Sequence, residues 1–346
     1  MARPSTTKGN AGRIRIGISG WRYPPWRGTF YPPGMPQRRE LEFASRYVST
    51  IEINGSFYSL QRPEHYARWR DETPDGFIFS VKGPRFITHM LKLRDSEQAL
   101  ANFFASGIAN LGDKLGPILW QLPPILRFDH ERLAVFLASL PRDSDEAAAL
   151  ARRRNDKVKG RARLAFGPCR PLRHALEIRH ETFVDESLID LLRSERIALV
   201  IADTAGKWPY AEDMTSDFVY ARLHGDEVLY VSGYTDEALA RWARRFIAWS
   251  NGSAPGDARC ISRLPSVPCA GRDVFCYFDN DAKVKAPRDA RALADIIHAA
   301  GARIVMPDAF PGEETNGSAT TQMVERFGGR GRARKRIAAR EGGGAG

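Results

Sequence analysis

Short runs of residues in which apolar and polar positions alternate recur along the chain and predict β-strands. In the clearest run, Ile51 and Ile53 alternate with Glu52 and Asn54, which is the period of two expected for a strand with one apolar face. Further apolar runs, several of them ended by Gly or Pro, follow at intervals that leave room for a helix. The predicted strands are 13–18, 50–54, 77–82, 117–122, 174–179, 197–203, 217–224 and 273–278.

Between these strands, apolar residues recur at helical spacing and predict helices. The predicted helices are 36–48, 63–72, 95–112, 129–140, 185–195, 235–250 and 287–301. Eight strands alternating with helices are typical of an α/β protein with a TIM-type (β/α)8 barrel, which we predict as a single domain over residues 14–306. An open doubly wound sheet is the alternative. No G-x-G-x-x-G or phosphate-binding loop opens the first helix, which argues against the nucleotide-binding versions of the doubly wound sheet.

Three segments fall outside this alternation and carry most of the positive charge. The net charge is +11, yet residues 152–163 hold seven basic and one acidic residue, and residues 326–340 hold seven basic and none acidic. We expect a flexible leader over 1–13, a charged insert over 142–166 before the fifth strand that is part helix and part disordered, and a disordered, Gly-rich basic tail over 307–346. Such segments can contact nucleic acid weakly through its phosphates or can simply be solvated.

The composition is that of a soluble globular protein, with 43% hydrophobic and 27% charged residues. No apolar run reaches the roughly 18 residues of a membrane span, and the N-terminal segment lacks the apolar core of a secretory signal. We therefore expect a cytoplasmic protein without a membrane partner. The four cysteines form no CxxC pair, which argues against structural zinc.

Alternation also assigns polar side chains to the barrel interior, where they crowd toward the carboxyl ends of the strands. Barrel enzymes build their active sites at these ends, and unpaired charges in a narrow interior are costly, so we treat these residues as functional candidates. The candidates for catalysis are Glu52, Glu177, Asp203 and His224. The candidates for substrate binding are Trp21, Asn54, Tyr58, Lys82, Gln121, Arg179, His180, Arg222 and Asn280.

Within this set, the cations Lys82, Arg179 and Arg222 can hold a phosphate or carboxylate group. The acids can exchange a proton with the substrate, and His224 can act as a proton shuttle. We therefore predict an enzyme that acts on a polar, anionic, sugar- or nucleotide-like small molecule by acid/base chemistry.

The aromatic and histidine residues on the loops add further candidates. Trp21 and Tyr58 follow the first two strands, and with their aromatic neighbours they form either a cover for the barrel or a platform on which a ring can stack. His89 follows the third strand and is a further candidate for the site, whereas His174 is expected to be a surface or packing residue.

The same residues leave other functions open. The carboxylates and His224 could bind Mg²⁺ or Mn²⁺ in a metal-dependent phosphodiesterase or endonuclease, although three neighbouring cationic side chains would repel the ion. We therefore assign no metal ligand and leave the cofactor unknown, with a divalent metal as the open alternative. The charges could also form only a structural salt-bridge network. The basic tail could belong to a non-catalytic nucleic-acid- or ligand-binding protein.

Several motifs, in this order along the chain, closely resemble those of the YecE-like family, also known as domain of unknown function 72. They are IGISGWRYPPWRGTFYP, TIEINGSFYSLQRPEHYARW, TPDGFIFSVKGPRFITH, LGPILWQLPP, ALEIRHETF, DFVYARLHG, SGYTDEAL and YFDND. The resemblance covers roughly residues 14–300 without the insert. It departs from the family pattern at Ser56, where the family has Thr, and at Phe183, where the family has Trp. The resemblance implies a TIM barrel and implies no particular reaction.

Overall fold

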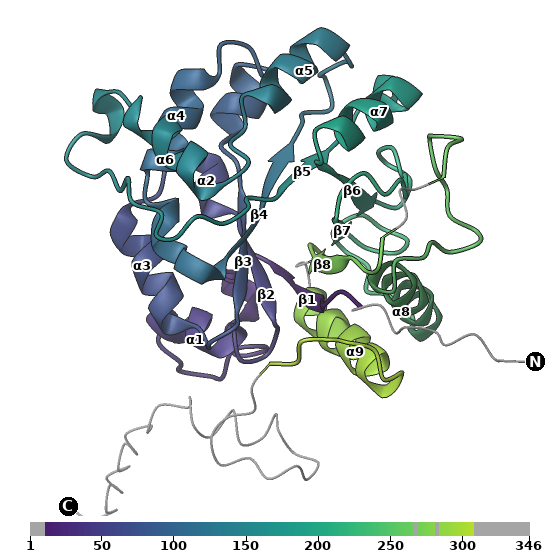
Figure 1. Ribbon diagram of the computed structural model, residues 1–346. Helices are drawn as coiled ribbons and strands as arrows, with labels where there is room; N and C mark the ends of the chain where they lie inside the picture. The colour runs from purple at the N-terminus through teal and green to yellow at the C-terminus, as the bar shows by residue number, and fades with distance from the viewer. Residues whose placement is uncertain (1–10, 266–268, 281–283, 308–346) are drawn as a thin grey trace, which may run out of the picture.

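Eight parallel strands close into a barrel, with the helices on its outside (Figure 1). The computed structural model describes residues 11–265, 269–280 and 284–307. Each strand pairs with its neighbours in chain order, and β1 pairs with β8, which closes the barrel. The strands are β1 (Ile14–Ser19), β2 (Thr50–Ile53), β3 (Ile78–Lys82), β4 (Leu115–Gln121), β5 (His174–Glu177), β6 (Ala198–Asp203), β7 (Phe218–Leu223) and β8 (Asp273–Phe278). The predicted TIM-type barrel is confirmed.

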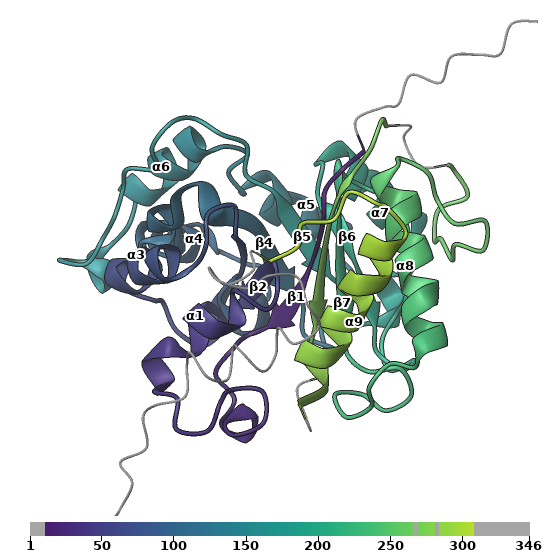
Figure 2. The same cartoon turned by 90° about the horizontal axis from the view of Figure 1, so that it is seen from below.

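The helices follow the strands in the predicted alternation. They are α1 (Glu40–Ala44), α2 (Gly55–Tyr58), α3 (Pro63–Glu72), α4 (Glu97–Ala105), α5 (His130–Ala138), α6 (Ser144–Arg152), α7 (Glu186–Ser194), α8 (Asp236–Ser250) and α9 (Lys285–Ala299). The two longest, α8 and α9, lie side by side in both views (Figures 1 and 2). None of the described helices is both long and apolar enough to cross a bilayer.

The helix predicted over 95–112 is shorter than expected, because α4 ends at Ala105. Gly107 has a φ of 109°, in the left-handed region, and a Cβ added there would lie 2.4 Å from the Cα atom of Pro63. Only glycine fits this close approach to the start of α3. The chain continues as a separate 3₁₀ helix, Ile108–Lys114.

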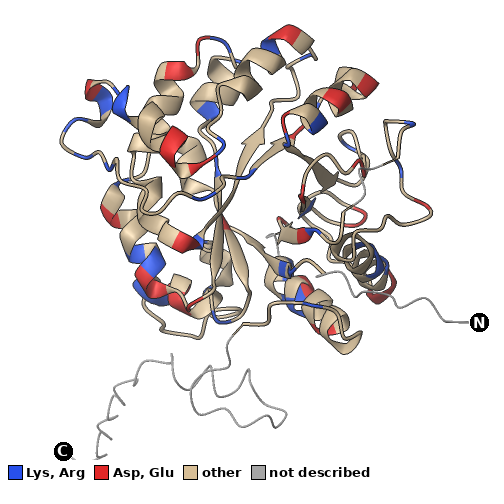
Figure 3. Cartoon of the chain, in the orientation of Figure 1, with Lys and Arg blue, Asp and Glu red and all other residues tan. Residues whose placement is uncertain are grey.

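The charged insert forms a helix that packs on the barrel's outer layer. Asp143 caps α6 by accepting hydrogen bonds from the backbone N–H groups of Asp145 and Glu146, and Ala147 and Ala151 on its inner face are buried. The helical part of the insert, α6, therefore packs against α4. The leader up to residue 10 and the tail from residue 308 lie outside the described residues. Acidic and basic side chains are interspersed over the outer helices (Figure 3).

Alternate residues of each strand face either the barrel interior or the surrounding helices. The interior contains an apolar cluster that includes Phe218, Tyr220, Phe275 and Tyr277. Hydroxyl groups connect it across the barrel, because the Tyr220 Oη atom lies 2.7 Å from Ser80 Oγ and the Tyr277 Oη atom lies 3.0 Å from Thr50 Oγ1. Residues in the same alternation as these tyrosines are directed inward.

The two ends of the described chain meet beside β1. The backbone N–H of Ile14 donates to the carbonyl oxygen of Arg303 at 2.9 Å, and the N–H of Val305 donates to the carbonyl oxygen of Ile14 at 2.9 Å. Residues 303–305 therefore form a clasp on the first residue of β1, after α9 has completed the outer layer.

We predict that Gly17→Ala strongly destabilises the barrel. Gly17 pairs with Thr50 in the β1–β2 register, and an added Cβ would lie 1.8 Å from the Thr50 carbonyl oxygen. The strands would have to separate, so the free energy of unfolding, measured in urea, should fall by about 3 kcal/mol. The matched control is Gly256→Ala, where nothing lies within 4 Å of the added atom. A Gly17→Ala protein as stable as this control would contradict the strand pairing.

Candidate active site at the barrel mouth

The guanidinium group of Arg222 is the centre of the charged cluster at the carboxyl ends of the strands. Arg222 is in the same alternation as Tyr220 and is 1% exposed. Its terminal nitrogens lie 3.0 Å from Glu52 Oε1, 2.9 Å from Glu177 Oε2 and 2.8 Å from Asp279 Oδ2. One arginine on β7 therefore joins carboxylates from β2, β5 and the end of β8.

Glu52 is buried, and both of its oxygens are occupied by donors. Oε1 accepts hydrogen bonds from Ser19 Oγ at 2.8 Å and from Arg222 at 3.0 Å. Oε2 accepts from Tyr220 Oη at 2.6 Å and from Arg222 Nε at 3.1 Å. Four donors match the acceptor capacity of a carboxylate. Glu52 therefore fixes Arg222 and Tyr220 in place and has no acceptor position left for a substrate.

Glu177 is held in a similar way. Gln121 Nε2 donates to both of its oxygens, at 3.0 and 2.9 Å, and Arg179 Nε donates at 2.7 Å. Burial acts to raise the pKa of Glu177, but the positive charges of Arg179 and Arg222 outweigh it and hold this pKa well below its usual range. The carboxylate stays ionised at neutral pH, which suits an electrostatic role better than proton transfer.

Asp279 is a member of this cluster that the sequence analysis missed. It follows β8 in the same alternation as Phe275 and Tyr277, and that alternation could have revealed it. Burial acts to raise its pKa, but the charge of Arg222 holds the pKa well below its usual range. Asp279 is therefore the third ionised acid around Arg222.

The placement of Asn280 in the interior was wrong by one residue. Its side chain is directed out of the barrel, where Nδ2 donates to Asp289 Oδ2 at 2.7 Å and to the carbonyl oxygen of Ser232 at 3.0 Å. Asn280 therefore ties the end of β8 to α9 and to the loop before α8. The neighbouring Asp279 takes the inward position.

The placement of Asp203 in the interior was also wrong. Its neighbour Ala202 pairs with Arg222 and belongs to the interior cluster, so Asp203 alternates to the outside. There, Asp203 Oδ2 accepts a hydrogen bond from Tyr234 Oη at 3.1 Å, and burial raises the pKa of its carboxyl group. The Asp203 side chain holds the segment before α8, and among the described residues only its backbone carbonyl bonds to the site, by accepting from the N–H of His224 at 2.9 Å.

His224 is fully buried between two members of the cluster. Its Nε2 atom lies 3.3 Å from an Arg222 nitrogen, and its Nδ1 atom lies 3.1 Å from Asp279 Oδ2, at an angle that is poor for a hydrogen bond. Arginine can only donate, so Nε2 is the acceptor. The rings of Trp208 and Tyr230 stand edge-on to the imidazole at 6.4 and 5.3 Å. This enclosure orients His224 against Arg222, while its Nδ1 atom makes no hydrogen bond with a described residue.

Lys82, the last residue of β3, differs from the other cations of the cluster. It is 8% exposed, and its amine makes no hydrogen bond or ion pair with any of the described residues; Nζ lies 4.5 Å from the centre of the Phe57 ring. Burial, followed by the charge of Arg222, lowers the pKa of Lys82 to about 8. Since Arg222 takes up the carboxylates, Lys82 is a buried amine without a counter-ion.

His89 lies on a short π-helix, Phe86–Met90, and packs on the same Phe57 ring as the Lys82 amine. Its ring is perpendicular to Phe57 at 5.1 Å, and its Nδ1 atom lies 2.8 Å from Thr88 Oγ1. Burial and the charges of Lys82 and Arg179 lower the pKa of His89 to about 4. The imidazole is therefore neutral at pH 7, and π-helical turns of this kind are frequent at functional sites.

Arg179 presents a second set of donors at the mouth. Only its Nε atom is bonded, to Glu177, and its terminal nitrogens have no partner within the described part of the chain. The guanidinium stacks on Trp208, 3.8 Å from the ring centre. Trp208 lies on the loop between β6 and β7, where no periodic pattern predicts its position. The only sequence feature that could have identified it is an aromatic residue in a loop with Gly and Pro.

The remaining candidates divide between structural and rim positions. Of the two roles predicted for Trp21, a cover or a platform, its packing fits the cover, because its buried ring stands edge-on against Trp69 of α3 at 5.3 Å. His180 caps the short helix Glu181–Phe183 by accepting from the N–H of Thr182. Asn54 donates to Ser19 Oγ at 2.9 Å and leaves its buried Oδ1 atom without a partner, while Tyr58 is 70% exposed at the rim. His174, predicted to be a packing residue, is buried against Trp120.

The donor set at the mouth does not fit a divalent cation. Among the described residues, ligand atoms of three His, Cys, Asp or Glu residues come within 4.8 Å of one another only at Asp143 and Asp145 of the insert and Cys169 just after it, away from the mouth. At the mouth, the guanidinium of Arg222 occupies the point on which the three carboxylates converge. The guanidinium of Arg222 therefore provides the positive charge that a metal ion would otherwise bring to these three carboxylates.

Fold and site together define a class: a TIM-type barrel protein with a buried network of acids and bases at the carboxyl ends of its strands. The family described as "Protein of unknown function DUF72" matches residues 15–314. The chain belongs to this family, which confirms the resemblance seen in its motifs.

Two curated relatives align over part of their length. The UPF0759 protein YecE of Escherichia coli (strain K12) is 32% identical over 110 residues, which are 32% of this chain and 38% of that protein. The UPF0759 protein YunF of Bacillus subtilis (strain 168) is 28% identical over 126 residues, or 35% of this chain and 44% of that protein. The aligned segments span less than half of either relative.

Two solved structures share the fold. A DUF72 family protein from Thermotoga maritima MSB8 has a TM-score of 0.62 at 21% identity, with 83% of this chain and 99% of that chain covered. A DUF72 family protein from Enterococcus faecalis V583 has a TM-score of 0.60 at 14% identity, with 88% of this chain and 100% of that chain covered. At these identities the similarity establishes the barrel and not its chemistry.

We predict that Arg222→Met destabilises the protein by about 3–5 kcal/mol, because three buried carboxylates would lose their shared cation. Urea unfolding at pH 7 measures the loss. Arg38→Met, at an exposed position, is the control and should change stability by less than about 0.5 kcal/mol. A loss below about 1 kcal/mol for Arg222→Met would show that the network does not depend on this residue.

We predict that Lys82 makes stability rise with pH above neutrality. Its pKa is about 8 in the folded protein and about 10.4 in an unfolded chain, so the unfolded state binds more protons between these values. The penalty for burying the charged amine is complete below pH 8 and is relieved as pH rises, on the order of 3 kcal/mol. Lys82→Met should be more stable than wild type at pH 7, and this difference should shrink toward pH 10.

The measurement is urea unfolding from pH 7 to pH 10, with Lys159→Met, at an exposed position of the insert, as the matched control. The control should keep the wild-type pH dependence. A stability difference between Lys82→Met and wild type that stays constant over this range would contradict a lowered pKa at Lys82.

Proposed function

We propose that this protein is an enzyme that binds a small anionic molecule at the barrel mouth and exchanges a proton with it through Lys82. The observation that carries the proposal is the buried amine of Lys82, which has no counter-ion among the described residues and a pKa lowered to about 8. Burying an uncompensated charge costs free energy, and a phosphate or carboxylate group of a ligand would supply the missing partner.

Arg179 supports the binding part of the proposal. Its terminal nitrogens have no protein partner in the described residues, and its stacking on Trp208 fixes the plane of the guanidinium. Such a fork suits two oxygens of one phosphate or carboxylate. The charges of both Lys82 and Arg179 act on His89 and lower its pKa.

The pKa values support the proton-exchange part. A catalytic acid or base is most effective when its pKa lies near the working pH, which describes Lys82. His89 is neutral at pH 7 and can accept or donate a hydrogen bond beside the amine. By contrast, Glu177 and Asp279 stay ionised, and Glu52 already accepts four hydrogen bonds. We therefore propose that these acids and His224 orient Arg222 and set the local electrostatic potential, and do not exchange protons with the substrate.

The proposal thus keeps the predicted substrate class and moves the proton chemistry from the glutamates to Lys82 and His89. The substrate class is a sugar- or nucleotide-like molecule that carries a phosphate or carboxylate group. The reaction class is one in which a positioned amine moves a proton, such as an isomerisation, elimination or hydrolysis.

The test begins with a panel of sugar phosphates, sugar acids and nucleotides, screened by the thermal shift of the purified protein. A hit is then titrated by calorimetry into wild type, Lys82→Met and the exposed control Lys159→Met. We expect Lys82→Met to weaken binding at least about tenfold, because a hydrogen bond to a charged group contributes about 1.5–3 kcal/mol. Incubation of wild type with the hit, followed by NMR, should reveal conversion or proton exchange in D₂O.

Three outcomes count against the proposal. The mouth would not be the anion-binding site if no member of the panel changed the melting temperature, or if wild type and Lys82→Met bound the hit equally well. If binding depends on Lys82 but neither conversion nor proton exchange is detected, the protein binds the ligand without catalysing a reaction, and the proposed enzymatic activity is wrong. Conversion that requires an added divalent metal would favour the metal-dependent hydrolase instead.

A further inference from the structure

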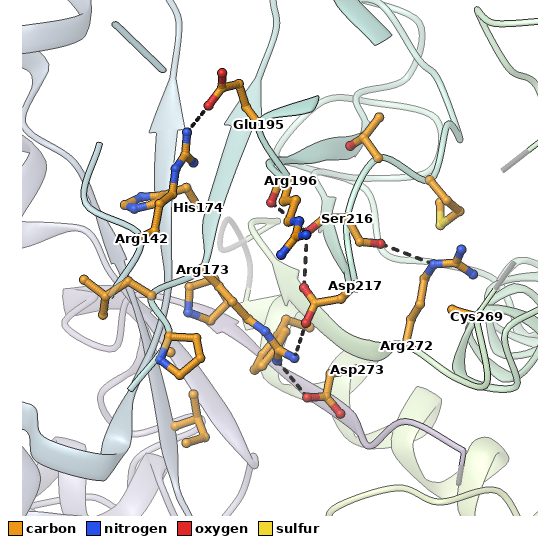
Figure 4. Close-up of a pocket in the computed structure, with 18 of the residues that line it drawn as sticks. Arg142, Arg173, His174, Glu195, Arg196, Ser216, Asp217, Cys269, Arg272 and Asp273 are labelled. Atoms are coloured by element: carbon orange, nitrogen blue, oxygen red, sulfur yellow. Dashed lines mark hydrogen bonds and ion pairs between the residues drawn. The ribbon is translucent and has the colours of Figure 1, made fainter. Parts of the chain in front are cut away.

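A cavity of about 1140 Å³ lies at the end of the barrel opposite the mouth, around the amino-terminal ends of the strands (Figure 4). Its described lining includes seven arginines and three acidic residues. Conserved chemistry in TIM barrels is usually found at the other end, and this end usually serves stability. An excess of arginine around a cavity is not needed for stability, so it calls for its own explanation.

The acidic residues of the lining are already paired. Arg173 lies 2.9 Å from Asp217 and 2.7 Å from Asp273, and Arg142 forms an ion pair with Glu195 (Figure 4). These pairs use two of the seven arginines and all three acids.

Three of the other arginines make no ion pair with a described residue. Arg193 has only neutral partners, Ser262 Oγ and the carbonyl oxygen of Leu264, each at 3.3 Å. Arg196 is exposed, and Arg15 is buried. The cavity wall therefore carries positive charge that the described protein does not neutralise.

Arg15 is the strongest indication of a ligand. It lies on β1, is 7% exposed, and its buried Nε atom has no hydrogen-bond partner within the described residues. Its guanidinium lies 5.8 Å from the centre of the Phe275 ring. Arginine stays charged even when buried, so this position is costly unless an anion in the cavity completes it.

Part of the remaining lining is apolar, and this part indicates the body of such an anion. Ile78, Leu115, Leu172, Met214 and Phe275 all line the cavity. Ligand sites typically enclose about 300–1,000 Å³ and combine apolar walls with a few placed polar groups. The cavity, at about 1140 Å³, is slightly larger than this range, and its lining suits a small molecule with an apolar or aromatic body and more than one negative charge.

We propose that this cavity is a second ligand site, which binds a phosphorylated small molecule of the nucleotide class. Arg15 contacts a phosphate from the barrel side, Arg193 and Arg196 contact the phosphates from the α7 side, and the apolar wall holds the rest of the molecule. This site is separate from the mouth. Arg15 and Ser19 are four residues apart on one strand, about 13 Å, with the tyrosines of the interior between the two ends.

The test is calorimetric titration of the full chain with ATP, ADP and pyrophosphate. We expect wild type to bind ATP and ADP more tightly than pyrophosphate, because pyrophosphate lacks the body that the apolar wall holds. Arg15→Met should weaken ATP binding about tenfold or more without loss of folding, since it removes an unpaired buried charge. Arg196→Ala, at an exposed position, should weaken it several-fold and keeps the test valid if Arg15→Met misfolds.

Two control variants separate this site from other sources of binding. Arg38→Ala should leave the affinity unchanged, and an equal loss in this variant would mean non-specific attraction to net charge. Lys82→Met should also leave it unchanged, and a loss confined to Lys82→Met would place the nucleotide at the mouth. No binding of any of the three probes to wild type, or binding only of a single-stranded RNA oligomer, would overturn the proposal.

Discussion

A single guanidinium group balances the interior of this barrel. Arg222 reaches carboxylates from β2, β5 and the end of β8, so strands on different sides of the closed sheet share one cation. Each buried acid would be unfavourable alone, and the arginine makes all three compatible with a dry interior. Because these acids are committed to Arg222, the amine of Lys82 is left without a partner, and the reactivity proposed for the mouth depends on that commitment.

The network also separates two roles that the sequence does not distinguish. Glu177 and Asp279 have lowered pKa values and act as fixed charges, while Lys82 and His89 have values moved by burial and by cationic neighbours. All four are ionisable residues near strand ends, and residue type alone does not sort them. Their roles follow from their neighbours: Glu177 and Asp279 pair with Arg222, whereas Lys82 and His89 pack on the Phe57 ring.

Much of the barrel could be predicted because the strand pattern depends on local alternation. That rule located Glu52, Glu177 and Arg222 on inward faces, and it failed where a strand ends: Asp203 and Asn280 alternate outward, although their neighbours face the interior. At the end of a strand, a polar residue can face either the barrel interior or the outside. Its polarity therefore does not predict which way its side chain is directed. The stacking of Trp208 and the lower cavity could not be predicted either, because both arise where separate loops meet.

The clasp of residues 303–305 on Ile14 has a consequence for how the chain becomes a barrel. The first strand receives its last backbone partners only from a segment that follows β8 and α9 in the chain. Until β8 and this segment are in place, the edge groups of β1 on that side remain open to water or to other chains. Barrel closure is therefore a long-range event, because it pairs β1 with the last strand of the barrel.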